Sequence, residues 1–257
     1  MLENFIEPLW VSDEETFQKI LKHPIKREDK KICLTKCPEY ARMLADNKVP
    51  CVFVETEEKE STVFGVDLIF AARDEVIEPD SELLKRVWQR HFSIPWQIAQ
   101  TERLIIRESV MTDLPEFMQM YESERENPDV VPMTGNPEEE LAAYIKYRYP
   151  FYEYGLWSII EKSTGKVIGR AGLQEYTEKN DSLEETCIEV AYLIAEQYRK
   201  KGYAREAVQA ILEYGEQELG QKAVYLRTSN ENRASRNLAK TLGFKRISEK
   251  LYWRIKK

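Results

Sequence analysis

One segment of this 257-residue chain combines an apolar strand, a basic turn and an amphipathic helix. Residues 188–194 are mostly β-branched or aromatic, and every second side chain shares one face, as in a buried strand. After the turn, apolar residues recur at helical spacing from Ala204 to Leu219, and Gly220 is placed to end the helix. The segment therefore predicts a strand that leads directly into a helix.

The turn between this strand and this helix is basic and contains a glycine. Arg199, Lys200 and Lys201 precede Gly202, which lets the backbone approach a ligand closely. The first amides of the helix lack partners within it, and such a terminus attracts an anion. A phosphate-bearing ligand is one interpretation, and an ordinary turn with solvated basic residues is the other. The turn has neither the Gly-Lys-Ser/Thr ending of a nucleoside-triphosphate loop nor the G-x-G-x-x-G of a dinucleotide fold.

Three motifs, in the same order along the chain, resemble those of the Gcn5-related N-acetyltransferases (GNAT). Residues 199–204 are similar to the Arg/Gln-x-x-Gly-x-Gly/Ala pyrophosphate loop, and residues 232–244 to the Asn-x-x-Ser helix ending in Leu-Gly-Phe. Residues 189–193 resemble a strand of the branch that acetylates ribosomal-protein amino termini. The resemblance covers about residues 101–257. It implies an α/β fold with a mixed, mostly antiparallel central sheet, splayed at the cofactor site and flanked by helices.

The first 98 residues lie outside this resemblance. They contain strand-like and helix-like segments in alternation: 31–35, 38–47, 51–55, 66–70 and 79–92. This alternation predicts a small parallel α/β domain whose strands are covered on both faces. The domain resembles part of a haloacid-dehalogenase-like or flavodoxin-like fold, but no Asp-x-Asp pair follows its first strand, and its role is open. We expect one domain over residues 1–98 and a GNAT domain over residues 99–257.

Composition limits the partners of this chain. It is 42% hydrophobic and 32% charged, as in a globular protein, and its formal net charge is −7. That charge argues against nucleic acids and anionic membranes as partners, and it suits a cationic acceptor. No apolar run is long enough to span a bilayer, and no signal-like segment opens the sequence. A cytoplasmic protein is therefore expected.

The cysteines do not indicate a metal site. Four cysteines and two histidines form no zinc-binding pattern, so no metal is expected. Cys33 and Cys37 are not spaced as a C-x-x-C motif, and reduced, ordinary thiols are the simpler interpretation beside a redox switch.

Acetyl-CoA is the cosubstrate that the resemblance implies. The loop would hold the pyrophosphate, the strand end would pair with the pantetheine, and an asparagine at the next helix would contact the cofactor while capping that helix. The residues expected to bind it are Leu193, Ile194, Arg199, Lys200, Lys201, Gly202, Tyr203, Ala204 and Asn232.

Two residues are candidates for catalysis. Glu189 is the expected base, because a carboxylate on an apolar central strand readily accepts a proton; the alternative is an ion pair with Arg170 or Arg227 on a neighbouring strand. The tyrosine acid of many GNAT enzymes is replaced here by Ala239. Ser235 matches a serine of the ribosomal-protein branch and is the candidate for protonating the leaving thiolate.

The resemblance implies an N-acetyltransferase that acetylates a primary amine, either a protein N-terminus or a small amine. The missing tyrosine leaves an alternative open, in which a regulatory or adaptor protein binds acetyl-CoA without turnover.

Overall fold

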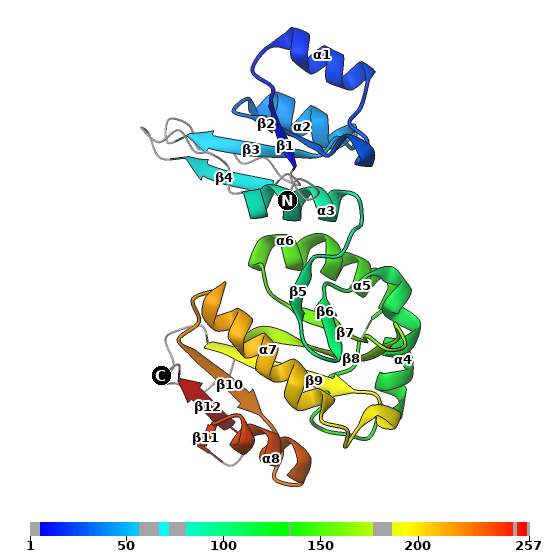
Figure 1. The fold of residues 1–257 in the computed structure, drawn as a ribbon, viewed down its shortest axis with the longest axis vertical. Coiled ribbons are helices and arrows are strands. Elements are labelled where there is room, and N and C mark those ends of the chain that lie inside the picture. The colour runs from blue at the N-terminus through cyan, green and yellow to red at the C-terminus, as the bar shows by residue number, and fades with distance from the viewer. Residues whose placement is uncertain are drawn as a thin grey trace. The chain divides into compact units, whose positions relative to one another are not determined.

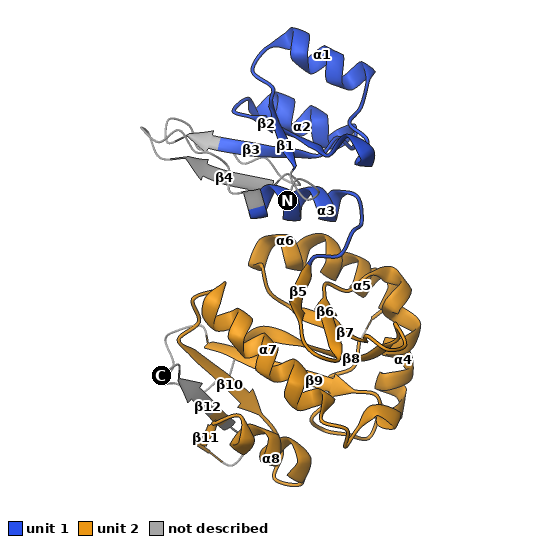
Figure 2. Ribbon diagram, in the orientation of Figure 1, with its two compact units in different colours: residues 1–96 blue, residues 97–257 orange. Residues whose placement is uncertain are grey.

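The computed structural model describes residues 6–56, 67–71, 81–133, 135–176, 187–248 and 251–255. The chain divides into two compact units, residues 1–96 and 97–257 (Figure 2). The division falls at residue 96 rather than 98, because strand β5 (Gln97–Gln100) pairs antiparallel with β6 (Leu104–Arg107) and so belongs to the second unit.

The first unit is built on a sheet whose four described strands are all parallel, in the order β1-β2-β3-β4 (Figure 1). On one face Leu34 packs in a core cluster with Leu84 of α3, and on the other Cys33 packs with Phe17 of α1. The small parallel α/β layer predicted from the sequence is confirmed. Its elements are β1 Glu7–Trp10, α1 Glu14–Lys22, η1 Arg27–Asp29, β2 Lys31–Thr35, α2 Pro38–Asp46, β3 Cys51–Thr56, β4 Asp67–Ala71 and α3 Ser81–His91.

Strand β1 is not indicated by the sequence, because Pro8 cannot donate a ladder hydrogen bond and argues against a strand. The structure resolves this conflict by placing β1 at the edge of the sheet. The sequential strand order also differs from a flavodoxin-like sheet, in which the first strand lies between the second and the third.

The second unit is built on a larger sheet with the strand order β11-β12-β10-β9-β8-β7-β6-β5. Neighbouring strands are antiparallel except for β9 and β10, which are parallel, so the mixed and mostly antiparallel sheet expected from the family resemblance is confirmed. The remaining strands are β7 Leu156–Glu161, β8 Val167–Tyr176, β9 Cys187–Ile194, β10 Ala223–Arg227, β11 Lys245–Arg246 and β12 Leu251–Ile255.

Helices cover both faces of this sheet. Val190 of β9 lies in a core cluster with Ala207 and Ile211 of α7, whereas Leu193 packs against a cluster that contains Phe117 of α4. Because residues at odd and even positions of a strand point to opposite faces, α7 and α4 lie on opposite sides of β9. The helices of this unit are η2 Met111–Asp113, α4 Leu114–Ser123, α5 Pro137–Ala143, the π-helix η3 Tyr144–Arg148, α6 Tyr149–Tyr152, η4 Glu196–Tyr198, α7 Tyr203–Gln217 and α8 Arg233–Thr241.

The two parallel strands β9 and β10 are paired at one position and then separate. Their register contains the single pair Glu189 and Tyr225, although β9 continues to Ile194 and β10 to Arg227. On its other side, β9 pairs with β8 along its whole length. The splay expected from the family resemblance therefore lies beyond Glu189, toward the carboxyl ends of both strands. Of the helices described, none combines the length and the apolar character needed to cross a membrane.

Candidate active site

The basic loop joins the end of β9 to the start of α7. Lys200 has φ of 60° and Gly202 has φ of 84°, and Gly202 is the N-cap of α7 without a side-chain cap. Because only glycine adopts this backbone conformation without strain, residue 202 suits the chain reversal that starts the helix. The first amides of an α-helix have no partner within it, so Tyr203 and Ala204 are placed to donate to an anion beside two lysines.

Arg199, by contrast, is engaged with the protein. Its Nε donates to the carbonyl of Ile194 at 2.9 Å, and its Nη2 contacts Oε1 of Glu124 at 2.5 Å. Arg199 therefore ties the loop to the end of β9 and to the end of α4. Its guanidinium supports the loop, while the amides and the lysines face outward.

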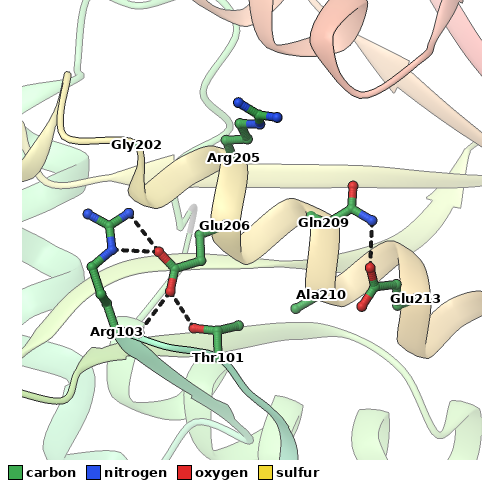
Figure 3. Close-up of a pocket in the computed structure, with 8 residues that line it drawn as sticks. All are labelled: Thr101, Arg103, Gly202, Arg205, Glu206, Gln209, Ala210 and Glu213. Atoms are coloured by element: carbon green, nitrogen blue, oxygen red, sulfur yellow. Dashed lines mark hydrogen bonds and ion pairs between the residues drawn. The ribbon is translucent and has the colours of Figure 1, made fainter.

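A second arginine, Arg103, also anchors the loop, and Figure 3 shows its contacts with Glu206. Arg103 donates from Nη1 to the carbonyl of Lys201 at 2.9 Å and from Nε to Oε2 of Glu206 at 2.7 Å, and its guanidinium lies 4.5 Å from the ring centre of Tyr203. Thr101 donates to the other oxygen of Glu206. Burial raises the pKa of Glu206, but these hydrogen bonds outweigh it and hold the pKa below its ordinary value.

Thr101, Arg103 and Glu206 help to line a hollow of about 400 Å³ beside Gly202 and the first turns of α7. In Figure 3 the Arg205 side chain points away from the ion pair between Arg103 and Glu206. Sequence reasoning missed this anchor. The available signal was Glu206, an acidic residue in the first turn of a helix that follows a basic loop.

The splay leaves one side of β9 unpaired. Leu193 packs toward α4, and Ile194 is buried in the main core, but their backbone faces no β10 partner among the described residues. Free backbone groups along a strand edge bind an extended ligand as they bind an added strand. Leu193 and Ile194, the residues expected to pair with the pantetheine, lie on this unpaired edge of β9.

Glu189 lies at the point where the two strands part, and it is 3% exposed. Its carboxylate accepts hydrogen bonds from Gln174 Nε2 at 2.6 Å and from Arg227 Nε and Nη2 at 2.7 and 2.8 Å. Of the two arginines considered from the sequence, Arg227 is the one that pairs with Glu189, whereas Arg170 donates to Tyr121. A carboxylate has about four acceptor positions, so roughly one remains.

The first turn of α8 holds the other candidates. Asn232 caps the helix by accepting from the Ser235 amide at 3.1 Å, and Ser235 is 6% exposed. A side-chain hydrogen bond joins Ser235 to Tyr192 of β9, and burial raises the pKa of Tyr192. Tyr192 belongs to the strand motif, but the sequence did not indicate that it meets Ser235, because the two are far apart in the chain.

Asp129, in the loop after α4, contacts the connection between β10 and α8. Its carboxylate accepts from the Ser229 amide at 3.0 Å, from the Thr228 hydroxyl at 3.2 Å and from Asn232 Nδ2 at 3.0 Å. Burial raises the pKa of Asp129, but these hydrogen bonds outweigh it and lower the pKa below its ordinary value. Asp129 therefore fastens this loop to the connection between β10 and α8, a contact that sequence reasoning missed.

The described cysteines are free thiols. Burial raises the pKa of Cys33 to about 12, and burial is also the main cause of the raised pKa of Cys37, whose Sγ donates to Glu39. Raised thiol pKa values disfavour the reactive thiolate, so they do not favour the redox switch considered above. The described residues contain no group of three or more His, Cys, Asp or Glu side chains able to hold a metal ion.

A splayed pair of parallel strands that opens beside a basic helix start is the arrangement expected for an acyl-CoA-dependent acetyltransferase. A family model for the GNAT acetyltransferase domain matches residues 103–245, which is more than half of the chain. The chain therefore belongs to the GNAT acetyltransferase family.

Two curated relatives are similar over part of the chain. The uncharacterized protein YkkB of Bacillus subtilis is 32% identical over 94 residues, which are 36% of this chain and 51% of that protein. The uncharacterized N-acetyltransferase p20 of Bacillus licheniformis is 31% identical over 90 residues, 35% of this chain and 48% of that protein. The chain thus spans about half the length of the curated relatives it matches.

Solved structures share the fold of the second unit. An acetyltransferase from Agrobacterium tumefaciens has a TM-score of 0.50 at 23% identity, covering 62% of this chain and 94% of that one. The ribosomal-protein acetyltransferase RimL has a TM-score of 0.50 at 13% identity, with coverages of 63% and 95%. YncA of Salmonella typhimurium, with acetyl-CoA bound, has a TM-score of 0.50 at 16% identity, with coverages of 60% and 94%. At such identities the likeness shows the fold alone.

Proposed function

We propose that this protein transfers the acetyl group of acetyl-CoA to a primary amine, either a protein N-terminus or a small amine. The observation that carries the proposal is the opening between β9 and β10 beyond Glu189, which leads to the basic start of α7. An extended thioester and a diphosphate need this combination of an unpaired strand edge and free amides.

The cofactor-binding roles follow from where the residues lie. Lys200, Lys201 and the amides from Gly202 to Ala204 would bind the pyrophosphate, with Arg199 supporting the loop from behind. Leu193 and Ile194 would pair with the pantetheine through their backbone. Asn232, which caps α8 and donates to Asp129, would contact the cofactor as well.

Bound acetyl-CoA supplies an activated acetyl group, and the protein must then supply a neutral amine and a proton for the thiolate. Glu189 is proposed to accept the amine proton at its remaining acceptor position, directly or through a water molecule. The ion pair with Arg227 supports the alternative that Glu189 is structural, because Arg227 donates to both of its oxygens.

Ser235 is proposed to deliver the proton to the leaving thiolate. Tyr192 is hydrogen-bonded to it, and the raised pKa of Tyr192 keeps the phenol protonated at neutral pH. As the serine hydroxyl gives its proton to the thiolate, the phenol passes its own proton to the serine oxygen, and the phenolate then takes a proton from solvent. This pair stands in for the tyrosine that is absent at Ala239, and it comes from β9 and α8 together.

The acceptor class remains a proposal. The strand motif at residues 189–193 supports the ribosomal-protein branch, and RimL, a ribosomal-protein acetyltransferase, shares the fold. The acidic net charge of −7 and the expected cytoplasmic location are compatible with a basic protein N-terminus as acceptor.

A pair of glycine variants tests the cofactor site. Acetyl-CoA at millimolar concentration should raise the melting temperature, because it binds only the folded protein. Gly202→Val should abolish this rise. Gly220→Val is the matched control, because Gly220 is also left-handed, with φ of 64°, but follows the other end of α7. If acetyl-CoA does not raise the melting temperature of the unmodified protein, the proposed cofactor site is wrong.

A product screen tests turnover. The protein is incubated with acetyl-CoA and a panel of peptides and small amines, and mass spectrometry detects free CoA and acetylated product. Acetylated product supports the transferase. Saturable acetyl-CoA binding without any product favours the adaptor role instead.

A further inference from the structure

Arg170 is a buried cation with no counter-charge among the described residues. It lies in β8 between Ser158 of β7 and Leu193 of β9, and it is 6% exposed. Among the described residues its one hydrogen bond to the protein runs from Nη1 to the Tyr121 hydroxyl at 3.0 Å. Its Nε is shut off from solvent and has no acceptor, and no described carboxylate forms an ion pair with it.

Aromatic rings surround the guanidinium. Its carbon lies 4.9 Å from the ring centre of Phe117 and 5.2 Å from that of Tyr144. Burial raises the pKa values of Tyr144 and Tyr149, so these phenols are neutral at physiological pH and supply no negative charge. An arginine stays protonated under the same conditions. Ring faces attract a cation, but they leave the guanidinium N–H groups without acceptors.

Arg107 has the carboxylate partner that Arg170 lacks among the described residues. Arg107 of β6 is also largely buried, and its two terminal nitrogens donate to the two oxygens of Asp113 at 2.7 and 2.8 Å. Buried charges are normally paired in this way, because an unpaired ion loses its hydration without compensation. No described carboxylate makes the corresponding contact to Arg170, whose Nε is left without an acceptor.

Arg170 lies close to the proposed active site. Its register partner Leu193 is one of the residues proposed to bind the pantetheine, and the side chain extends toward α4 and η3 on the face that carries Glu189. Tyr144 begins the π-helix η3, and π-helical turns are frequent at functional sites. An anion at Arg170 would thus lie on the acceptor side of β9.

We propose that Arg170 binds a carboxylate carried by the acceptor, so that the enzyme selects amines that also bear a carboxylate. This inference rests on the proposed acetyl transfer. A planar guanidinium pairs with two carboxylate oxygens at once, and the rings of Phe117 and Tyr144 suit the carbon atoms between the carboxylate and the amine. A dication such as a polyamine is disfavoured, because a second positive charge would approach Arg170.

Measurements of the melting temperature, made without substrate, test whether Arg170 is an unpaired charge in the folded protein. Methionine keeps an unbranched, flexible stem like that of arginine but carries no charge. Arg170→Met should leave the melting temperature unchanged or raise it, because an unpaired buried charge is removed. Arg107→Met should lower it, because Asp113 is left buried and unpaired. An equal loss in both variants would show that Arg170 is held by the protein itself, which overturns the proposal.

Anion binding is then measured with the cofactor site filled. With CoA saturating, sodium succinate should raise the melting temperature of the unmodified protein above that in sodium chloride of equal ionic strength. Arg170→Met should lose this rise. If Arg170→Met instead weakens CoA binding alone, the anion belongs to the cofactor, and if succinate acts equally on both proteins, Arg170 is not its site. Either result overturns the proposal.

Matched acceptors test selection directly. Peptides that begin Ser-Glu and Ser-Gln differ by one charge, as do β-alanine and its amide, so the two pairs separate peptide acceptors from small ones. In at least one of the two pairs, the unmodified enzyme should use the carboxylate-bearing member with a kcat/KM about tenfold or more above that of its amide. This ratio corresponds to the free energy of one charged hydrogen bond. Arg170→Met should bring the ratio near one. Equal use of both members of each pair contradicts Arg170 while leaving acetyl transfer intact.

Discussion

Arg227 Nε lies 2.7 Å from Glu189 Oε2, so β10 and β9 stay joined by side chains where their backbones separate. The ion pair spans the opening in which the thioester is proposed to lie. Glu189 is 3% exposed, whereas the Arg227 side chain is 48% exposed, so the carboxylate is the more confined partner. This geometry makes Glu189 either a base held in place or a structural partner of Arg227, and the two roles predict different kinetics.

Replacing Glu189 by glutamine separates these roles. If Glu189 is the base, Glu189→Gln should lower kcat about 10²–10⁴-fold, because the amide keeps the size and loses only proton acceptance. Acetyl-CoA affinity, measured by titration, should be nearly unchanged. Arg227→Met is the companion variant and should lower the free energy of unfolding by about 1–3 kcal/mol, since Glu189 is left unpaired. Full activity of Glu189→Gln would make Glu189 a structural residue.

The pair Tyr192 and Ser235 predicts a second kinetic effect. Tyr192→Phe and Ser235→Ala should each lower kcat by about tenfold or more, with acetyl-CoA affinity retained. Because burial raises the pKa of Tyr192 above the ordinary value of 10.0, the rate of the unmodified enzyme should fall only at a pH above that value. This alkaline decline should disappear in Tyr192→Phe. A profile shared by both proteins would rule out Tyr192 as the proton source.

The anchor at Arg103 predicts an effect on cofactor affinity. Arg103→Met removes the bonds to Lys201 and Glu206, so the loop loses one of its supports. Acetyl-CoA should bind about tenfold more weakly, as measured by calorimetry. Gln209→Ala is the matched control, because Gln209 lines the same hollow but its side chain is hydrogen-bonded to Glu213 rather than to the loop. Equal affinities in both variants would show that the loop does not depend on this anchor.

Asp129 predicts a pH dependence of stability. Hydrogen bonds hold its folded-state pKa below the ordinary value of 3.8, despite the opposing effect of burial. Its contribution is therefore present above pH 3.8 and is lost as the pH falls through the folded-state pKa. Asp129→Asn should melt below the unmodified protein near neutral pH, and the difference should shrink as the pH falls below 3.8. A constant difference, like that of the surface control Asp46→Asn, would contradict this role.

Two fragments test the division of the chain. A fragment of residues 97–257 keeps β5 paired with β6 and should bind acetyl-CoA like the full chain. A fragment of residues 102–257 loses β5 and also Thr101, which donates to Glu206, and it should be less stable. If the longer fragment folds, by circular dichroism, but fails to bind acetyl-CoA, the first unit contributes to the cofactor site.

Local patterns were sufficient for the elements that carry the cofactor loop. The alternation from Ile188 to Ile194, the glycine at 202 and the helical period after Ala204 depend on near neighbours in the chain, and all three occur as predicted. The parallel layer of the first unit followed from the same kind of signal. The sequence analysis predicted neither β1 nor β5, because these short strands form through pairing with β2 and β6.

By itself, the sequence indicated the family and the strand, loop and helix from Ile188 to Leu219, and it supplied nine expected cofactor residues that remain a proposal. Only the tertiary structure decided which side chains contact one another. Glu189 pairs with Arg227 rather than Arg170, and Tyr192 meets Ser235. The physical reason is that side-chain pairing across strands and helices depends on distances between residues far apart in the chain, which a periodic pattern does not encode. The same folding left Arg170 buried and without a counter-charge among the described residues.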